Sequence, residues 1–175
     1  MIKGQCDPRF KKIKDIFSNS LGSGFETGAA LAIEYKGEVI VNLWGGHQDS
    51  NKNLEWEENT LINVFSVTKG ITAICVSRLI DQGKLDHNQK VSYYWPEYGC
   101  NGKENTIVSD FLCHRAGMFG FQNGMPKGSW QNWQNFVSHL EAQTPYSMPG
   151  TSQGYHALTY GWLVGELFRR VDGRT

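Results

Sequence analysis

The sequence lacks the features that mark several large classes of protein. Its 17 Lys and Arg are balanced by 17 Asp and Glu, so the formal net charge is zero, which excludes nucleic-acid binding through bulk positive charge. No run of 18 apolar residues occurs in the 175 residues, so no membrane-spanning helix is expected. There are only 5 prolines and no segment of low complexity, which excludes a disordered or fibrous chain.

Cysteine is also scarce. Cys6, Cys75, Cys100 and Cys113 form neither a CxxC pair nor the dense framework of a small secreted domain. The N-terminus, MIKGQCDPRFKKIK, has no apolar run of signal-peptide length. We therefore expect reduced thiols in a soluble, intracellular, cytoplasmic protein without a signal peptide. The histidines and Cys113 lack the regular spacing of metal ligands.

What the sequence does contain is the composition of a packed enzyme. Hydrophobic residues make up 39% and aromatic residues 13%, and 20 glycines are present. A chain of this length allows one domain with a full-sized core. No internal repeat or linker divides it.

The spacing of apolar residues predicts an opening helix followed by a β-hairpin. Asp7-Pro8 provides a cap and a first-turn proline, and the helix is expected to end at the cluster Gly22–Gly24. Over residues 28–44 the period becomes two, with a turn at Lys36-Gly37. The alternation predicts that Tyr35 and its neighbours at every second position share one face of the hairpin.

Only helices are predicted after the hairpin. They are expected from Val67 to Gly83, after a cap at Thr106, after a cap at Ser129, and from Leu158 to Asp172-Gly173. The hairpin therefore has no partner strand in the chain, and a lone two-stranded hairpin is at best marginally stable. The sequence predicts a sheet whose other strands are absent, with self-association through its uncovered edge.

The clearest chemical motif is the tetrad Ser66-Val67-Thr68-Lys69 at the start of a predicted helix. One helical turn brings residues three apart to the same face, so the Lys69 ammonium is expected beside the Ser66 hydroxyl. A cation there, together with the positive end of the helix, favours loss of the serine proton. The tetrad alone is weak, because a capping serine and a solvated lysine often share this spacing.

Five segments in order along the chain carry a resemblance to a known family. They read GAALAIEYKGEVIVNLWGG, NVFSVTKG, GKLDHNQKVSYYWPEY, IVSDFLCHRAGM and PGTSQGYHALTYGWLVGELFRRVDGR. The sequence resembles the serine β-lactamase-like superfamily, specifically the branch of class C β-lactamases, esterases and penicillin-binding-protein relatives. The resemblance implies an α/β (α+β) fold of the β-lactamase/transpeptidase type, in which an antiparallel sheet packs beside a helical region.

The resemblance also implies roles for three residues. Ser66 is expected to be the acylated nucleophile, and Lys69 to lower its proton affinity. Tyr155 stands in the family's second motif, where a tyrosinate-like oxygen acts as general base and returns the proton to the leaving group. This motif reads Tyr155-His156-Ala157 here, whereas β-lactam-hydrolysing members have Tyr-x-Asn. Small esters or amides are therefore the expected substrates, and no metal or organic cofactor is implied.

The family's third motif, a Lys/His-x-Gly on a strand beside the nucleophile, is expected far beyond Tyr155, but the sequence ends at Thr175. By resemblance that strand also gives the second oxyanion donor, and losing one donor lowers turnover by about 10²–10³. We therefore expect a single partial domain over residues 1–175, truncated before the C-terminal strands, of a serine hydrolase incomplete as it stands. The alternative is a catalytically inactive scaffold that acts as an interaction, structural or regulatory protein.

The remaining patterns have structural as well as functional interpretations. Ser109-Asp110 is similar to the start of an S-D-N motif, but it lies within a helix expected to be scaffold. His114 is expected to order a turn by hydrogen bonding. His156 is expected either to assist polar contacts near Tyr155 or, as the preferred interpretation, to meet solvent at a helix start. Six aromatic residues line either an acyl pocket or the core: Tyr93, Tyr94, Trp95, Tyr98, Trp130 and Trp133.

Overall fold

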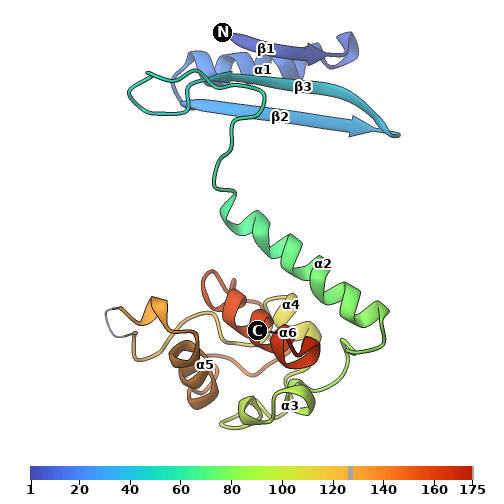
Figure 1. Ribbon diagram of the computed structural model, residues 1–175, viewed down its shortest axis with the longest axis vertical. Helices are drawn as coiled ribbons and strands as arrows, with labels where there is room; N and C mark the ends of the chain where they lie inside the picture. Colours follow the sequence, from blue (N-terminus) through green and yellow to red (C-terminus); the bar gives the residue numbers. More distant parts are fainter. Residues whose placement is uncertain (126–127, 175) are drawn as a thin grey trace. The chain divides into compact units, whose positions relative to one another are not determined.

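The computed structural model describes residues 1–125 and 128–174. The chain divides into two compact units, Met1–Asn63 and Val64–Thr175, which Figure 1 shows as a sheet with one helix and as a group of helices. Each unit has its own cluster of buried apolar side chains. That the two units belong to one partial domain stays a prediction.

The first unit is a three-stranded antiparallel sheet with a helix on one face. Its elements are β1 (Ile2–Cys6), the 3₁₀ turn η1 (Pro8–Phe10), α1 (Lys11–Gly22), β2 (Gly28–Tyr35) and β3 (Glu38–Gly46), and the strand order is β1-β3-β2. The opening helix and the hairpin are confirmed. Lys36 and Gly37 both have positive φ, as the favoured two-residue hairpin turn requires.

The prediction that the hairpin has no partner strand in the chain is wrong. β1 pairs with β3 along its whole length, from Ile2 opposite Gly45 to Cys6 opposite Val41. The strand is short, and Gly4 at its centre breaks the pattern of side chains that would reveal it. Glycine is required there, because φ is +101° and a Cβ would lie 2.0 Å from a carbonyl oxygen of β3.

The predicted alternation of inward-facing and outward-facing side chains along the hairpin holds only near α1. Ile33 and Val41 belong to the cluster that packs against this helix. Tyr35 and Val39, in contrast, are about half exposed. A register shift between Ile33 and Glu34 breaks the period of two, so the end of the hairpin does not continue the inward face.

The second unit is helical. Its elements are η2 (Phe65–Val67), α2 (Thr68–Asp81), α3 (Val91–Tyr94), η3 (Pro96–Tyr98), α4 (Val108–Leu112), η4 (Ser129–Gln131), α5 (Trp133–Ala142) and α6 (Thr159–Asp172). Helix α6 is central, since α2, α3, α4 and α5 all contact it. Its buried side chains, among them Leu163, Val164 and Leu167, lie in the main core of the unit.

The helices predicted for this unit are confirmed, but two of the predicted caps are wrong. Asn132, not Ser129, caps α5 by accepting a backbone N–H, and Ser129 instead begins the turn η4. Helix α4 is preceded by Ile107 rather than by Thr106, which is buried and accepts a backbone hydrogen bond. Helix α6 ends as predicted at Gly173, whose φ of 75° suits glycine.

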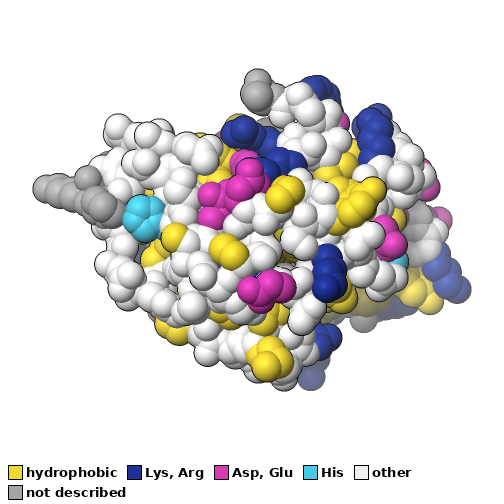
Figure 2. Space-filling model, turned by 90° about the horizontal axis from the view of Figure 1, so that it is seen from below, with side chains coloured by type: hydrophobic (Ala, Val, Ile, Leu, Met, Phe, Trp, Pro, Cys, Tyr) yellow, Lys and Arg dark blue, Asp and Glu magenta, His cyan; other side chains and the backbone are white. Residues whose placement is uncertain are grey.

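The surface has mixed charge. Figure 2 shows acidic and basic side chains interspersed on the face that it presents, without one large patch of either sign. Among the helices of the described residues, none is long and apolar enough to cross a membrane.

Candidate active site

The tetrad lies where a 3₁₀ turn runs into α2. Ser66 is the middle residue of η2, and α2 begins at Thr68. Phe65, directly before the serine, has a φ of 43°, a left-handed conformation that is rare for a bulky residue. Such strained backbone often occurs at functional sites, where the surrounding structure holds it in place.

Lys69 links the start of α2 to the segment before α6. Its Nζ donates to Ser66 Oγ over 3.2 Å and to the backbone oxygen of Ala157 over 2.9 Å. The same nitrogen lies 5.0 Å from the ring centroid of Tyr155 and 5.7 Å from that of Tyr160, within the range of cation–π attraction. The ammonium thus contacts the Ser66 hydroxyl, the Ala157 backbone oxygen and the rings of Tyr155 and Tyr160.

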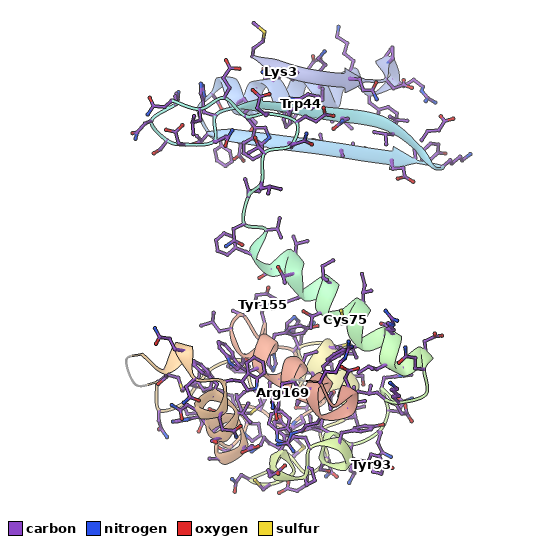
Figure 3. The ribbon with its side chains drawn as sticks, viewed as in Figure 1. Lys3, Trp44, Cys75, Tyr93, Tyr155 and Arg169 are labelled. Carbon is purple, nitrogen blue, oxygen red and sulfur yellow. The ribbon has the colours of Figure 1, made fainter. Side chains whose placement is uncertain are left out.

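Tyr155 lies in the segment that leads to α6 and is labelled in Figure 3. Its side chain is about half exposed. Hydrogen bonding to Ser66 is the largest cause that lowers the pKa of the phenol, and the hydrogen bond and positive charge of Lys69 lower it further, while desolvation opposes them. The structure thus brings Ser66, Lys69 and Tyr155 together.

Two histidines hold the backbone beside Tyr155. The backbone N–H of His156 donates to Nδ1 of His114 over 3.1 Å. The His156 ring donates from Nδ1 to the Gly154 oxygen over 2.6 Å and accepts the Met118 N–H at Nε2 over 3.1 Å. The prediction that His156 meets solvent is wrong, because its ring closes these bonds inside the unit and is fully buried. The predicted turn-ordering role of His114 is confirmed.

Both histidines favour the neutral form. Burial is the main cause that lowers the pKa of His156 to about 4, and it also lowers the pKa of His114, with a contribution from the charge of Lys69. At neutral pH the two imidazoles beside Tyr155 are therefore uncharged.

The other candidate residues are structural. Asp110 is buried and accepts the backbone N–H of Ile107, which confirms that Ser109-Asp110 belongs to the scaffold. Within residues 1–125 and 128–174, no three His, Cys, Asp or Glu side chains gather as metal ligands would. The four cysteines are free thiols, as predicted.

The aromatic residues named from the sequence divide between core and surface. Trp95 and Tyr98 are fully buried and belong to the core, while Tyr93 is mostly exposed. Trp133 lines a cavity beside Lys69. The side chain of Trp130, also named from the sequence, lies outside the described part of the chain.

The aromatic pocket considered from the sequence shares Trp133 with this cavity, whose other lining residues were not predicted. The cavity has a volume of about 520 Å³ and lies between the start of α2, the start of α6 and the segment before α5. Its apolar lining includes Phe65, Trp133, Leu158, Tyr160 and Trp162. These residues come from three separate stretches, so no single sequence pattern contains them.

The sequence profile of the family described as Beta-lactamase matches residues 13–175. The chain belongs to the Beta-lactamase family. A relative in this family, "Esterase/beta-lactamase LipL" of Mycobacterium tuberculosis, is 36% identical over 99% of this chain and 40% of its own length.

Two solved structures support the predicted β-lactamase/transpeptidase fold. A penicillin-binding-protein homologue from Caulobacter crescentus superposes with a TM-score of 0.93 at 39% identity. A family VIII carboxylesterase superposes with a TM-score of 0.89 at 40% identity. Each match covers 100% of this chain and 47% of the other. The chain therefore spans less than half the length of these family members.

Proposed function

We propose that this chain carries the acylation centre of a serine hydrolase that acts on small carboxylic esters or amides. The observation that supports this most directly is the convergence of a hydroxyl, an ammonium and a phenol of lowered pKa at Ser66, Lys69 and Tyr155. A nucleophile, a cation and a proton acceptor within hydrogen-bond reach are the groups that acyl transfer to serine needs.

In the proposed reaction, Ser66 Oγ attacks the carbonyl carbon of the substrate while the Tyr155 phenolate takes the hydroxyl proton. Lys69 stabilises negative charge on both oxygens. The bond to the leaving group then breaks, and Tyr155 returns the proton to the departing alcohol or amine. Water next attacks the acyl-Ser66 ester and gives a proton to Tyr155. Transfer of that proton to Ser66 Oγ releases the carboxylic acid and restores the site.

The choice of esters rests on one residue and on the relatives. Ala157 has no side-chain amide to hold the acylamino group of a β-lactam, and only its backbone oxygen contacts Lys69. Family members similar to this chain are described as an esterase/beta-lactamase and a carboxylesterase. Because the chain spans less than half of their length, we propose acylation of Ser66 as its reaction and full turnover only as a further step.

A serine-directed phosphonate with a chromogenic leaving group tests this proposal. The full chain and the variants Ser66→Ala and Ser77→Ala are each treated with the phosphonate, and their intact masses are measured by mass spectrometry. Ser77 is a matched control, since it is an exposed serine on α2 whose hydroxyl donates to a backbone oxygen one turn earlier. We expect one adduct on the wild type and on the control, and none on Ser66→Ala. Labelling that survives in Ser66→Ala contradicts the assignment.

The exposed face of α2 favours a second function, that of a scaffold for association. Val67, Ile71 and Ile74 are each more than half exposed and follow one another at helical spacing, so they form an apolar stripe. A chain that is folded by circular dichroism but takes up no phosphonate would support the scaffold. The same stripe would then be the surface to probe by substitution.

A further inference from the structure

His114 ties down the backbone on both sides of Tyr155. The backbone N–H of Gly154 donates to the backbone oxygen of His114 over 3.0 Å, and the backbone N–H of His156 donates to Nδ1 of the same residue over 3.1 Å. The residues directly before and after Tyr155 are therefore bound to one residue of the turn that follows α4. Because both neighbours are fixed, the direction in which the Tyr155 side chain leaves the backbone is fixed as well.

The ring of His114 also contacts the Tyr155 side chain itself. The centroids of the two rings are 4.8 Å apart, and the same imidazole lies 5.1 Å from the ring of Tyr160 on α6. These are the two tyrosine rings that the Lys69 ammonium faces, at 5.0 and 5.7 Å. Aromatic rings at such separations attract one another, so the imidazole holds the phenol ring as well as the backbone that carries it.

This arrangement requires an unusual backbone conformation at residue 114. The φ of His114 is 60°, in the left-handed region that few residues other than glycine adopt, although His and Asn tolerate it better than most. The turn holds this conformation, since the N–H of His114 donates to the Phe111 oxygen over 3.4 Å and that of Arg115 to the Asp110 oxygen over 2.7 Å. Backbone strain that the surrounding structure maintains beside a candidate site points to a role in that site.

We propose that His114 is a positioning residue for Tyr155, and that it holds the phenol oxygen where it can take the proton of Ser66. The inference rests on the proposed function and assigns the placement of its general base to a residue of another segment. His114 acts through Tyr155 and transfers no proton itself. Its Nδ1 accepts the His156 N–H, so the proton of the neutral ring is on Nε2. Burial and the charge of Lys69 favour this neutral form.

The position of the phenol can be measured through its ionisation. The hydrogen bonds to Ser66 and Lys69 and the charge of Lys69 lower the pKa of Tyr155, and these interactions weaken as the groups move apart. The pKa of Tyr155 therefore reports whether the phenol is held beside them. Proton transfer is equally sensitive, since a displacement of about 1 Å can slow a reaction about 10²-fold.

Three variants separate this role from a general effect on folding. His114→Gly removes the side chain at a φ that glycine adopts freely. His114→Asn also tolerates this φ, and its side-chain oxygen can accept the His156 N–H in place of Nδ1. Gln153→Ala is the matched control, because the exposed Gln153 amide donates to the backbone oxygen of Cys113 over 3.2 Å. It removes another hydrogen bond between the same two segments and leaves both bonds of His114 in place.

The first measurement is the rate at which the phosphonate labels Ser66 at neutral pH. We expect His114→Gly to be labelled about 10²-fold more slowly than the wild type, and His114→Asn and Gln153→Ala to stay within about tenfold of it. Labelling of His114→Gly at the wild-type rate overturns the inference. An equal decrease in Gln153→Ala overturns it too, because the loss would then follow from loosening of the segments.

The second measurement is the pKa of the Tyr155 phenol, followed by NMR on chains whose tyrosines carry ¹³C at Cζ. The signal is assigned from its loss in Tyr155→Phe. We expect a pKa below the ordinary value of about 10 in the wild type, His114→Asn and Gln153→Ala, and a value near 10 in His114→Gly. A purely structural role would reduce the amount of folded chain without moving this pKa. A wild-type value near 10, or the same lowered value in His114→Gly, overturns the inference.

The two measurements keep this inference apart from the proposed function. If neither the wild type nor any variant is labelled, the proposed acylation fails, while the pKa of Tyr155 still decides whether His114 positions the phenol. If His114→Gly is unfolded by circular dichroism, His114→Gln replaces it, because its side-chain oxygen lies one methylene beyond the position of Nδ1. We then expect a lowered pKa in His114→Asn and a value near 10 in His114→Gln. Equal values in these two variants overturn the inference.

Discussion

The buried ring of His156 makes the stability of the helical unit depend on pH. The ring is neutral, with its proton on Nδ1, because Gly154 supplies an acceptor and Met118 a donor. Protonation at Nε2 would place the new N–H opposite the backbone N–H of Met118, so that two donors would face each other without an acceptor. Since burial lowers the pKa in the folded chain from 6.5 to about 4, the unfolded chain takes up the proton first as the pH falls.

The size of the effect follows from the two pKa values. Stability from this histidine is fully present above about pH 6.5 and is lost as the pH falls toward 4, by about 3 kcal/mol in all. At pH 4.5 about 2.5 kcal/mol of it is already gone. Glutamine at this position keeps one donor and one acceptor but does not titrate, so His156→Gln is expected to lose this part of the pH dependence.

Urea unfolding followed by far-ultraviolet circular dichroism at pH 7.0 and 4.5 measures the effect. The free energy of unfolding of the wild type should fall by about 2 to 3 kcal/mol more than that of His156→Gln, because all other groups titrate in both. An NMR titration of the wild type should place the pKa of His156 well below 6.5. Equal losses in the two proteins, or a His156 pKa near 6.5, would refute the reasoning.

Two further predictions concern the helical unit. Lys103→Met removes the ammonium that donates to the backbone oxygens of Glu141 and Gln143 at the end of α5. This change should lower the free energy of unfolding, measured in urea, by about 2 kcal/mol. An unchanged free energy of unfolding would contradict this role of Lys103. Gly117→Ala should lower the melting temperature much more than Gly124→Ala. Both glycines have φ near 65°, but only at Gly117 would a Cβ lie 2.1 Å from a backbone oxygen. Equal decreases in melting temperature would show that this close approach does not matter.

Local patterns were sufficient to predict most elements of the fold. Hydrophobic spacing indicated the hairpin and the main helices, and Gly173 marked the end of α6, because these features depend on neighbours in sequence. The strand β1 was missed because its pairing depends on backbone atoms of β3 and on Gly4, whose role is visible only once the strands meet. The order of the residues along the chain does not show that β1 pairs with β3 at the edge of the sheet.

The features of the candidate site also differ in whether the sequence could predict them. Ser66 and Lys69 are one turn apart, so their contact could be predicted from spacing. Tyr155 is far away in sequence, and only the family resemblance placed it beside them. The backbone oxygen of Ala157, the burial of His156 and the aromatic cavity arise from tertiary packing. No local signal in the sequence carries that information.

The most direct test of the account is the labelling rate of Ser66 by the phosphonate in Tyr155→Phe. This change removes only a hydroxyl from a half-exposed side chain, so the fold is expected to persist, as circular dichroism can verify. Loss of a general base slows such steps by about 10²–10⁴, and we predict a decrease within that range, with the adduct mapped to the Ser66 peptide. A Tyr155→Phe chain that is labelled at Ser66 as fast as the wild type would contradict the account.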